Sequence, residues 1–216
     1  MRYSTPIVLS LAVAAACLLP ACGKAYMAAA EAFGYEKREM LTDRVEAARD
    51  QQMEAREQFE SALDEFRALT GPIDEDLEEL YDRLDKQLDR SRSKASGVRS
   101  RIAKVEEVAD ALFKEWREEL DDYHTESLRA SSEEQLEQTE QRYQQLIDAM
   151  KRAESRMQPV LDAFSDQVLF LKHNLNARAV AALKSEVGNI GGKVDRLIED
   201  MNKAIAEADS FIQTMK

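Results

Sequence analysis

Residues that interrupt helices are scarce in this sequence. Its 216 residues include seven glycines and four prolines, and only 6% of the chain is aromatic. Charged residues, by contrast, make up 33% of the chain. This composition is typical of long helices and argues against both sheets and disorder.

Cysteine is scarce too, with only Cys17 and Cys22. Cys17 lies in an uncharged run, residues 6–21, that follows Arg2 near the start of the chain. The run is shorter than the roughly 20 apolar residues of a membrane-spanning helix, and it has the pattern of a secretory signal peptide. Removal of this signal would leave Cys22 as the only cysteine, which excludes an internal disulfide in the mature chain.

The signal ends in LPAC, residues 19–22, which resembles a bacterial lipobox. A lipobox cysteine is acylated and becomes the mature N-terminus, which would leave no thiol for catalysis. The alternative is an ordinary signal peptide cut nearby, with Cys22 incidental. Gly23 stands where aspartate usually marks retention in the inner membrane, and this favours the outer membrane. We therefore expect a signal peptide over 1–21, a membrane-proximal segment over 22–35, and a periplasmic chain anchored to a membrane by lipid.

The formal net charge of the chain is −12 at pH 7. An acidic chain repels phosphate backbones, so we expect no nucleic-acid partner.

Apolar residues recur at alternating steps of three and four, which predicts the seams of a helical coiled coil. The first helix is predicted over residues 36–69, with Gln52 as one polar position in its seam. Thr70-Gly71-Pro72 then ends it, and a second helix is predicted over 73–123. A helix of about 50 residues would be roughly 75 Å long, which predicts a rod rather than a compact globule.

A third helix is predicted after a turn over residues 124–131, with Ser131 or Ser132 as its N-cap. Pro159 removes a backbone hydrogen bond inside this helix, so we expect a kink or a short break just before it. The segment from Val160 to Leu183 is rich in apolar residues and poor in charge. We expect it to be the most enclosed part of the bundle.

The last apolar stripe, over residues 187–215, contains Gly188, Gly191 and Gly192. Glycine costs roughly 1 kcal/mol inside a helix, so the chain either turns here or continues as one helix with a soft joint. The unbroken stripe favours the joint, whereas the need to cover the seam favours the turn. The predicted fold is all-α, an elongated antiparallel coiled-coil bundle of three to four long helices over 36–216.

The sequence lacks the motifs that would indicate catalysis or metal binding. Neither His124 nor His173 follows a glutamate by three residues, as the di-metal centres of helical bundles require. A Gly-x-Ser-x-Gly motif and a glycine-rich phosphate loop are also missing. We expect no catalytic residue, no metal and no cofactor.

Residues 90–104 carry six basic side chains and no acidic one. The segment either packs beside an acidic helix of the same bundle or contacts an anionic envelope partner, such as lipid headgroups or cell-wall polymer. The candidates for an anionic-surface contact are Arg90, Arg92, Lys94, Arg99, Arg101 and Lys104.

A polar cluster interrupts the apolar segment and comprises Lys172, His173, Asn174 and Asn176. Buried polar groups need partners, so we interpret these residues as interhelical hydrogen bonds that fix the helix register. The alternative is a contact site for a ligand or a protein.

Three stretches resemble a known family: YEKREMLTDRVEAARDQQMEAREQFESALDEF, DQVLFLKHNLNARAVAAL and LIEDMNKAIAEADSFI. They are similar to an uncharacterised family of proteobacterial envelope lipoproteins, a domain of unknown function. The likeness extends over roughly residues 26–212, and LKHNLNA is its most specific part. The resemblance implies a helical envelope protein with no assigned activity and no catalytic residues to carry over.

We therefore expect a non-enzymatic envelope lipoprotein that acts as a structural or protein-interaction module. Its partners would be a membrane, through the lipid, and either an unknown envelope protein or another copy of itself. The alternative is a periplasmic ligand-binding or regulatory module that uses Lys172–Asn176.

Overall fold

The computed structural model describes residues 37–68, 76–174 and 176–215, which lie in one compact unit. This part of the chain is helical and contains no strand; its elements are α2 (Lys37–Ala68), α3 (Leu77–Glu119), the 3-10 helix η1 (Leu120–Asp122), α4 (Glu126–His173) and α5 (Ala177–Met215). With 48 residues, α4 is about 72 Å long at the usual helical rise.

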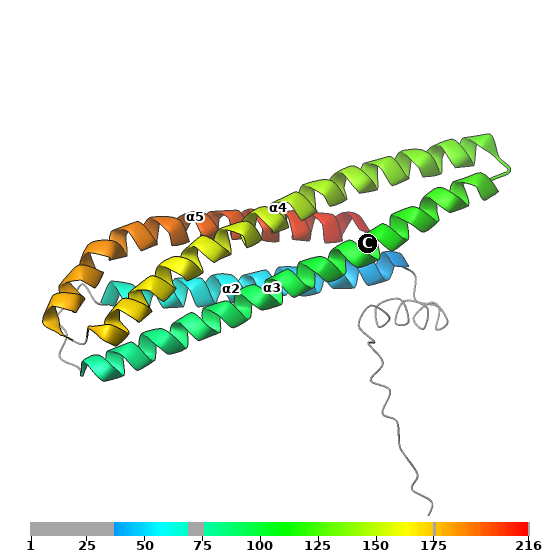
Figure 1. The fold of residues 1–216 in the computed structure, drawn as a ribbon. Coiled ribbons are helices and arrows are strands. Elements are labelled where there is room, and N and C mark those ends of the chain that lie inside the picture. The colour runs from blue at the N-terminus through cyan, green and yellow to red at the C-terminus, as the bar shows by residue number, and fades with distance from the viewer. Residues whose placement is uncertain (1–36, 69–75, 175, 216) are drawn as a thin grey trace, which may run out of the picture. The chain divides into compact units, whose positions relative to one another are not determined.

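The four long helices form an antiparallel bundle (Figure 1). Each helix packs against the next one along the chain, and α5 returns to pack against α2. The register of α2 against α5 is marked by two contacts, Arg49 Nη1 to Asp209 Oδ1 at 3.0 Å and Arg56 Nη1 to Asn202 Oδ1 at 2.9 Å. The predicted all-α bundle of long antiparallel helices is confirmed.

The predicted seams supply the core. The stripe predicted for the first helix is buried at every described position, namely Leu41, Val45, Ala48, Gln52, Ala55, Phe59, Ala62 and Phe66. The 3–4 spacing places these residues on one side of the helix, so burying that side removes a continuous apolar surface from water.

Aromatic rings concentrate at two levels of the core. At one level Phe164 stacks on Phe66, with ring centroids 4.8 Å apart, and lies 6.4 Å from Phe59. At the other, Tyr143 meets Phe113 edge-on at 5.3 Å and Phe211 at 6.5 Å. Between these levels the core of α2 and α5 is rich in alanine, with Ala48, Ala55, Ala204 and Ala208.

The start of α4 differs from the prediction. The helix begins at Glu126, and the carbonyl of Thr125 accepts hydrogen bonds from the backbone N–H groups of Leu128 and Arg129. The predicted cap at Ser131 or Ser132 is therefore wrong. Ser132 lies inside α4, where its hydroxyl accepts a hydrogen bond from Trp116 Nε1 at 2.9 Å.

Pro159 does not break α4, which continues through it. Proline cannot donate a hydrogen bond to the carbonyl of Ser155, one turn earlier. Both residues are exposed, so water can solvate that carbonyl. The expected break is absent because the missing bond falls on the solvent side of the helix.

The second half of the chain is divided between α4, which ends at His173, and α5, which begins at Ala177, and Gly188, Gly191 and Gly192 lie inside α5. Of the two alternatives for the glycines, the structure therefore has the continuous helix and not the turn. The segment from Val160 to Leu183 is divided between two helices and reaches the end of the bundle. The expectation that it is the most enclosed part is wrong, because Leu169 and Phe170 are 55% and 41% exposed.

At the other end, α3 and α4 extend past the start of α2 and the end of α5 as a two-helix hairpin (Figure 1). Lys37 Nζ, on the first residue of α2, lies 2.7 Å from Glu115 Oε1, which marks where the hairpin begins. We call residues 116–139 the hairpin end. The predicted signal peptide, Cys22, residues 22–35 and the turn at 70–72 lie outside the described residues.

Candidate functional site

The six basic residues of segment 90–104 do not share one face of α3. At about 100° per residue, Arg92 and Arg99 lie on the side toward α4, and the other four lie on the side away from α4. The contacts agree with this division. Lys94 Nζ is 2.7 Å from Glu54 Oε2 of α2, whereas Arg99 Nε is 2.8 Å from Glu154 Oε1 of α4.

These ion pairs favour the intramolecular interpretation of the basic segment. The hydrogen bond from Lys94 is the main cause that lowers the pKa of Glu54. Within the described part of the chain, Arg90, Arg101 and Lys104 form no salt bridge. Arg92, Lys94 and Arg99 are thus paired within the bundle, whereas the other three basic residues share the side of α3 away from α4. Contact of the segment with an anionic partner stays a prediction.

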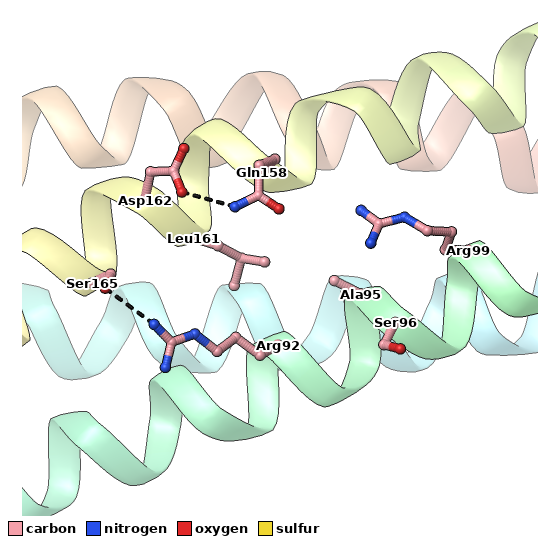
Figure 2. Close-up of a pocket in the computed structure, with 8 residues that line it drawn as sticks. All are labelled: Arg92, Ala95, Ser96, Arg99, Gln158, Leu161, Asp162 and Ser165. Atoms are coloured by element: carbon pink, nitrogen blue, oxygen red, sulfur yellow. Dashed lines mark hydrogen bonds between the residues drawn. The ribbon is translucent and has the colours of Figure 1, made fainter.

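A groove of about 260 Å³ lies between α3 and α4 (Figure 2). Ala95 and Leu161 are among its lining residues, and the arginines Arg92 and Arg99 reach it from α3. Arg92 Nη2 donates to Ser165 Oγ at 3.1 Å, across the groove.

Carboxylates offset the two arginines of this groove. Arg92 Nη1 lies 3.3 Å from Asp89 Oδ1, and Arg99 is paired with Glu154. A third carboxylate, Asp162, accepts a hydrogen bond from Gln158 Nε2 at 2.8 Å. Asp162 lines the groove itself, whereas Asp89 and Glu154 pair with the two arginines from outside its lining. Neither guanidinium is therefore without a carboxylate partner.

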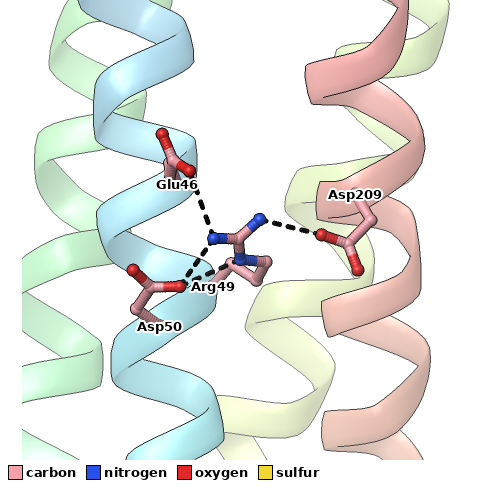
Figure 3. Close-up of polar contacts among 4 residues, drawn as sticks. All are labelled: Glu46, Arg49, Asp50 and Asp209. Atoms are coloured by element: carbon pink, nitrogen blue, oxygen red, sulfur yellow. Dashed lines mark hydrogen bonds and ion pairs between the residues drawn. The ribbon is translucent and has the colours of Figure 1, made fainter.

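Arg49 is the centre of an acidic cluster that joins α2 to α5 (Figure 3). Its guanidinium contacts Glu46, Asp50 and Asp209, at 3.3, 2.8 and 3.0 Å. The hydrogen bond to Asp50 is the largest cause that raises the pKa of Arg49, and Asp209 adds to it. The guanidinium is therefore held in its charged form and fixes the register of the two helices.

A second ion pair, between Arg156 and Asp200, joins α4 to α5. The Asp200 side chain is 8% exposed and the Arg156 side chain 45%. A carboxylate buried this far needs a partner, and Arg156 supplies it. The pair is thus part of the packing of the bundle.

Gln52 is the most unusual polar residue of the core. It is 0% exposed, and neither polar atom of its side chain has a hydrogen-bond partner. On the same helix, Gln58 Nε2 donates to Gln87 Oε1 of α3 at 2.8 Å. Gln52 is therefore an unsatisfied polar group in an alanine-rich layer of the core.

The cluster predicted at Lys172, His173, Asn174 and Asn176 forms the turn between α4 and α5. Lys172, His173 and Asn176 are exposed, so the expectation that the cluster is buried between helices is wrong. Asn174 Nδ2 donates to the carbonyl of Phe170 at 2.9 Å, and Asn176 N–H donates to the carbonyl of Asn174. The Asn174 side chain thus bonds nearby backbone, as asparagine does at turns, and α4 ends there. The role of the cluster as partner contacts stays a prediction.

Both ends of the bundle expose apolar side chains that the sequence patterns did not single out. Leu169 and Phe170 lie beside the α4–α5 turn, and Tyr123 and Leu128, at 41% and 57% exposure, lie at the hairpin end. In the sequence, the doublet Leu169-Phe170 departs from the one-sided apolar stripe of α4, and this pattern indicates that both side chains cannot face the core. The sequence did not reveal that the bundle ends there.

Among the described residues, no group of three or more His, Cys, Asp or Glu side chains is placed to hold a metal ion. None of the described helices is both long and apolar enough to cross a membrane. His124 and His173 are both exposed, at opposite ends of α4.

Residues 26–215 match the family described as protein of unknown function (DUF2959), a range that includes all four long helices. No curated protein and no solved structure matches the chain. The resemblance to a domain of unknown function is confirmed, and the lipoprotein and proteobacterial parts of it stay predictions.

Proposed function

We propose that this chain, which belongs to the DUF2959 family of proteins of unknown function, is an acylated protein of the bacterial cell envelope. Its helical bundle acts as a structural or protein-interaction module and not as an enzyme. The lipid on Cys22 attaches it to the periplasmic face of the outer membrane.

The observation that carries this proposal is the cysteine at the end of the signal pattern. LPAC, residues 19–22, lies at the end of the uncharged run, where a lipoprotein peptidase would cut before Cys22. Gly23 supports the outer membrane over the inner one. Support for an interaction module comes from the bundle, whose long helices bury one continuous core and leave a surface rich in charge.

Mass spectrometry of the mature N-terminus tests the anchor. We expect the chain to begin at Cys22, with a diacylglycerol group on its sulfur, when it is purified from bacterial envelopes. The matched control is Cys22→Ala, which should remain unprocessed and carry no lipid. A mature chain that begins elsewhere, or an unmodified Cys22, would overturn the anchor.

Crosslinking in intact envelopes tests the interaction module. Photoreactive groups at Leu128 and at Leu169 sample the two ends of the bundle, and both side chains are more than half exposed. A module with a stable partner should give a discrete adduct from one of these positions. Recovery of crosslinked copies of the chain alone would indicate self-association, and the lack of any adduct at either end would contradict the proposal.

The ligand-binding alternative placed its site at Lys172–Asn176. Lys172, His173 and Asn176 are exposed, which suits a surface contact better than an enclosed ligand site. We therefore retain the interaction module as the proposed function.

A further inference from the structure

One side of the bundle is formed by α2 and α3, which pack against each other and run antiparallel (Figure 1). Two ion pairs across this side show which residues share a level along the helix axes. Lys94 Nζ lies 2.7 Å from Glu54 Oε2, and Arg83 Nε lies 2.8 Å from Glu65 Oε2. The two pairs are equally far apart along both helices, so the levels stay matched over this stretch.

The same register sets the levels of four exposed charged residues, Asp43 and Glu57 of α2 and Arg90 and Lys104 of α3. Glu57 lies within about one residue of the level of Arg90, and Asp43 within about one residue of that of Lys104. Within the described part of the chain, none of these four residues takes part in a salt bridge. Their charges are therefore available to a partner that presents opposite charges at the same levels.

Opposite charges occupy the two halves of this surface, which we call the α2–α3 side. At about 100° per residue, α2 directs acidic side chains to it and α3 directs basic ones. The acidic ones are Asp43, Asp50, Glu54, Glu57 and Glu65, and the basic ones are Lys86, Arg90, Lys94, Arg101 and Lys104. Small side chains lie among the charges, namely Ala47, Ser61, Ser93 and Ser100, and they allow another pair of helices to approach closely.

A surface with an acidic half and a basic half is complementary to a copy of itself. In a two-fold dimer whose axis is parallel to the helices, α2 of each copy lies over α3 of the other, and every residue keeps its level. Glu57 of one copy then meets Arg90 of the other, and Asp43 meets Lys104. A two-fold axis across the helices would instead place α2 over α2 and α3 over α3, which the repulsion of like charges opposes.

We propose that the α2–α3 side binds a second copy of this chain, in a two-fold dimer whose equivalent helices are parallel. With 32 residues, α2 is about 48 Å long, and two adjacent helices are about 20 Å wide. The dimer would thus bury up to about 1,900 Å² in total, within the range of stable interfaces. Single ion pairs at a surface contribute little, so these charges select the partner and its orientation, and the packed area supplies the affinity.

The dimer names the partner for the interaction role proposed above, and it rests on that role but not on the lipid. In the parallel arrangement, α2 of both copies begins at the same end of the dimer. The two chains are therefore able to be attached to one membrane, as the proposed anchor requires.

Co-purification of two differently tagged full-length copies from bacterial envelopes tests the dimer. Asp43→Lys/Glu57→Lys reverses the acidic half, and Arg90→Glu/Lys104→Glu reverses the basic half. Each double variant, expressed under both tags, should co-purify with itself at least about tenfold less than the parent chain, because like charges then meet at these contacts. The two double variants expressed together should co-purify as the parent does, because every one of these contacts again joins opposite charges.

The matched control is Glu137→Lys/Asp166→Lys, which makes the same change in charge as the α2 variant at exposed positions of α4. It should co-purify with itself as the parent does, and circular dichroism should show parental helicity in every variant. Parent copies that do not co-purify, reversed variants that associate with themselves, or a mixed pair that does not recover would each overturn the dimer. If crosslinks from Leu128 or Leu169 then still capture another protein, the interaction role stands without the dimer, and if they capture none, both are contradicted.

Discussion

Among single residues, Gln52 lowers the stability of the fold, because its buried side-chain amide has no hydrogen-bond partner. A buried polar group without a partner loses its hydrogen bonds to water, at about 1–3 kcal/mol, and gains none in the fold. Such residues are kept in some coiled coils because they specify register. At Gln52 the polar group lies in a seam whose flanking positions are alanines, Ala48 and Ala55.

We predict that Gln52→Leu raises the free energy of unfolding by about 1–3 kcal/mol, because it replaces an unsatisfied amide with an apolar group of similar size. Urea denaturation measures the change. Gln58→Leu is the matched control: it removes a hydrogen bond to Gln87 and should not stabilise the fold. A loss of stability in Gln52→Leu would mean that the amide has a partner in solution, such as a buried water.

Tyr143 should make the fold sensitive to alkaline pH. Burial, with a smaller effect from Glu106 and Asp110, raises the pKa of its phenol above the ordinary value of about 10. The fold favours the neutral phenol, so this contribution is complete below about pH 10 and is lost as the pH rises further. We predict that Tyr143→Phe loses less free energy of unfolding than the parent chain between about pH 9 and about pH 11. Identical pH profiles in the two proteins would contradict this.

At the scale of elements, α4 contains Pro159 in its interior, far from both of its ends. Pro159→Ala restores a hydrogen-bond donor and helix propensity, so we predict a gain of up to about 3 kcal/mol in the free energy of unfolding. Thermal and urea unfolding measure the gain. The neighbouring Gln158→Ala is the control and should change stability by no more than about 0.5 kcal/mol. A loss in Pro159→Ala would show that the packing of α4 depends on a bend at the proline.

The elements differ in how far sequence alone predicts them. The seams were predictable because steps of three and four residues place Leu41 to Phe66 on one side of a helix, whatever packs against it. The turn at Asn174 was not, because it has neither glycine nor proline, and the asparagine caps become recognisable only once α4 is known to end there. Conversely, Gly188–Gly192 resembled a turn, yet the helix continues because Val187, Ile190 and Val194 are buried on one side.

The candidate sites were less predictable than the helices, because a site depends on contacts between residues that are far apart along the chain. Segment 90–104 is a single basic run in the sequence, but the helix distributes its side chains to two neighbours. Their partners, Glu54 and Glu154, lie 40 and 55 residues away along the chain. Only the tertiary arrangement brings these charges together, so the run by itself could not distinguish an internal ion-pair network from an external surface.

At the scale of the whole bundle, stability should vary along the helices. Around Tyr143 three helices, α3, α4 and α5, bring aromatic rings together in the core, whereas the described elements of the hairpin end are the end of α3, η1 and the start of α4. No residue from Asp121 to Ser131 is buried. Regions with few buried contacts open more easily than the core.

We therefore predict that backbone amides of residues 127–139 exchange with deuterium at least about tenfold faster than those of residues 143–157, although both stretches belong to α4. Mass spectrometry of peptic fragments measures the difference. Trp116→Phe, which removes the hydrogen bond to Ser132, should increase exchange in the first stretch and leave the second unchanged. Equal protection along α4 would show that the hairpin end is covered in solution.

The placement of α2 has a mechanical consequence. α2 begins beside Glu115, and the turn between α4 and α5 lies at the opposite end of the bundle. A pull between Lys37 and that turn would act parallel to the helix axes. It would load the seams in shear, so many core contacts would have to yield together, whereas a sideways pull would peel them apart one by one. A bundle connected in this way resists stretching along its length far better than it resists being peeled open.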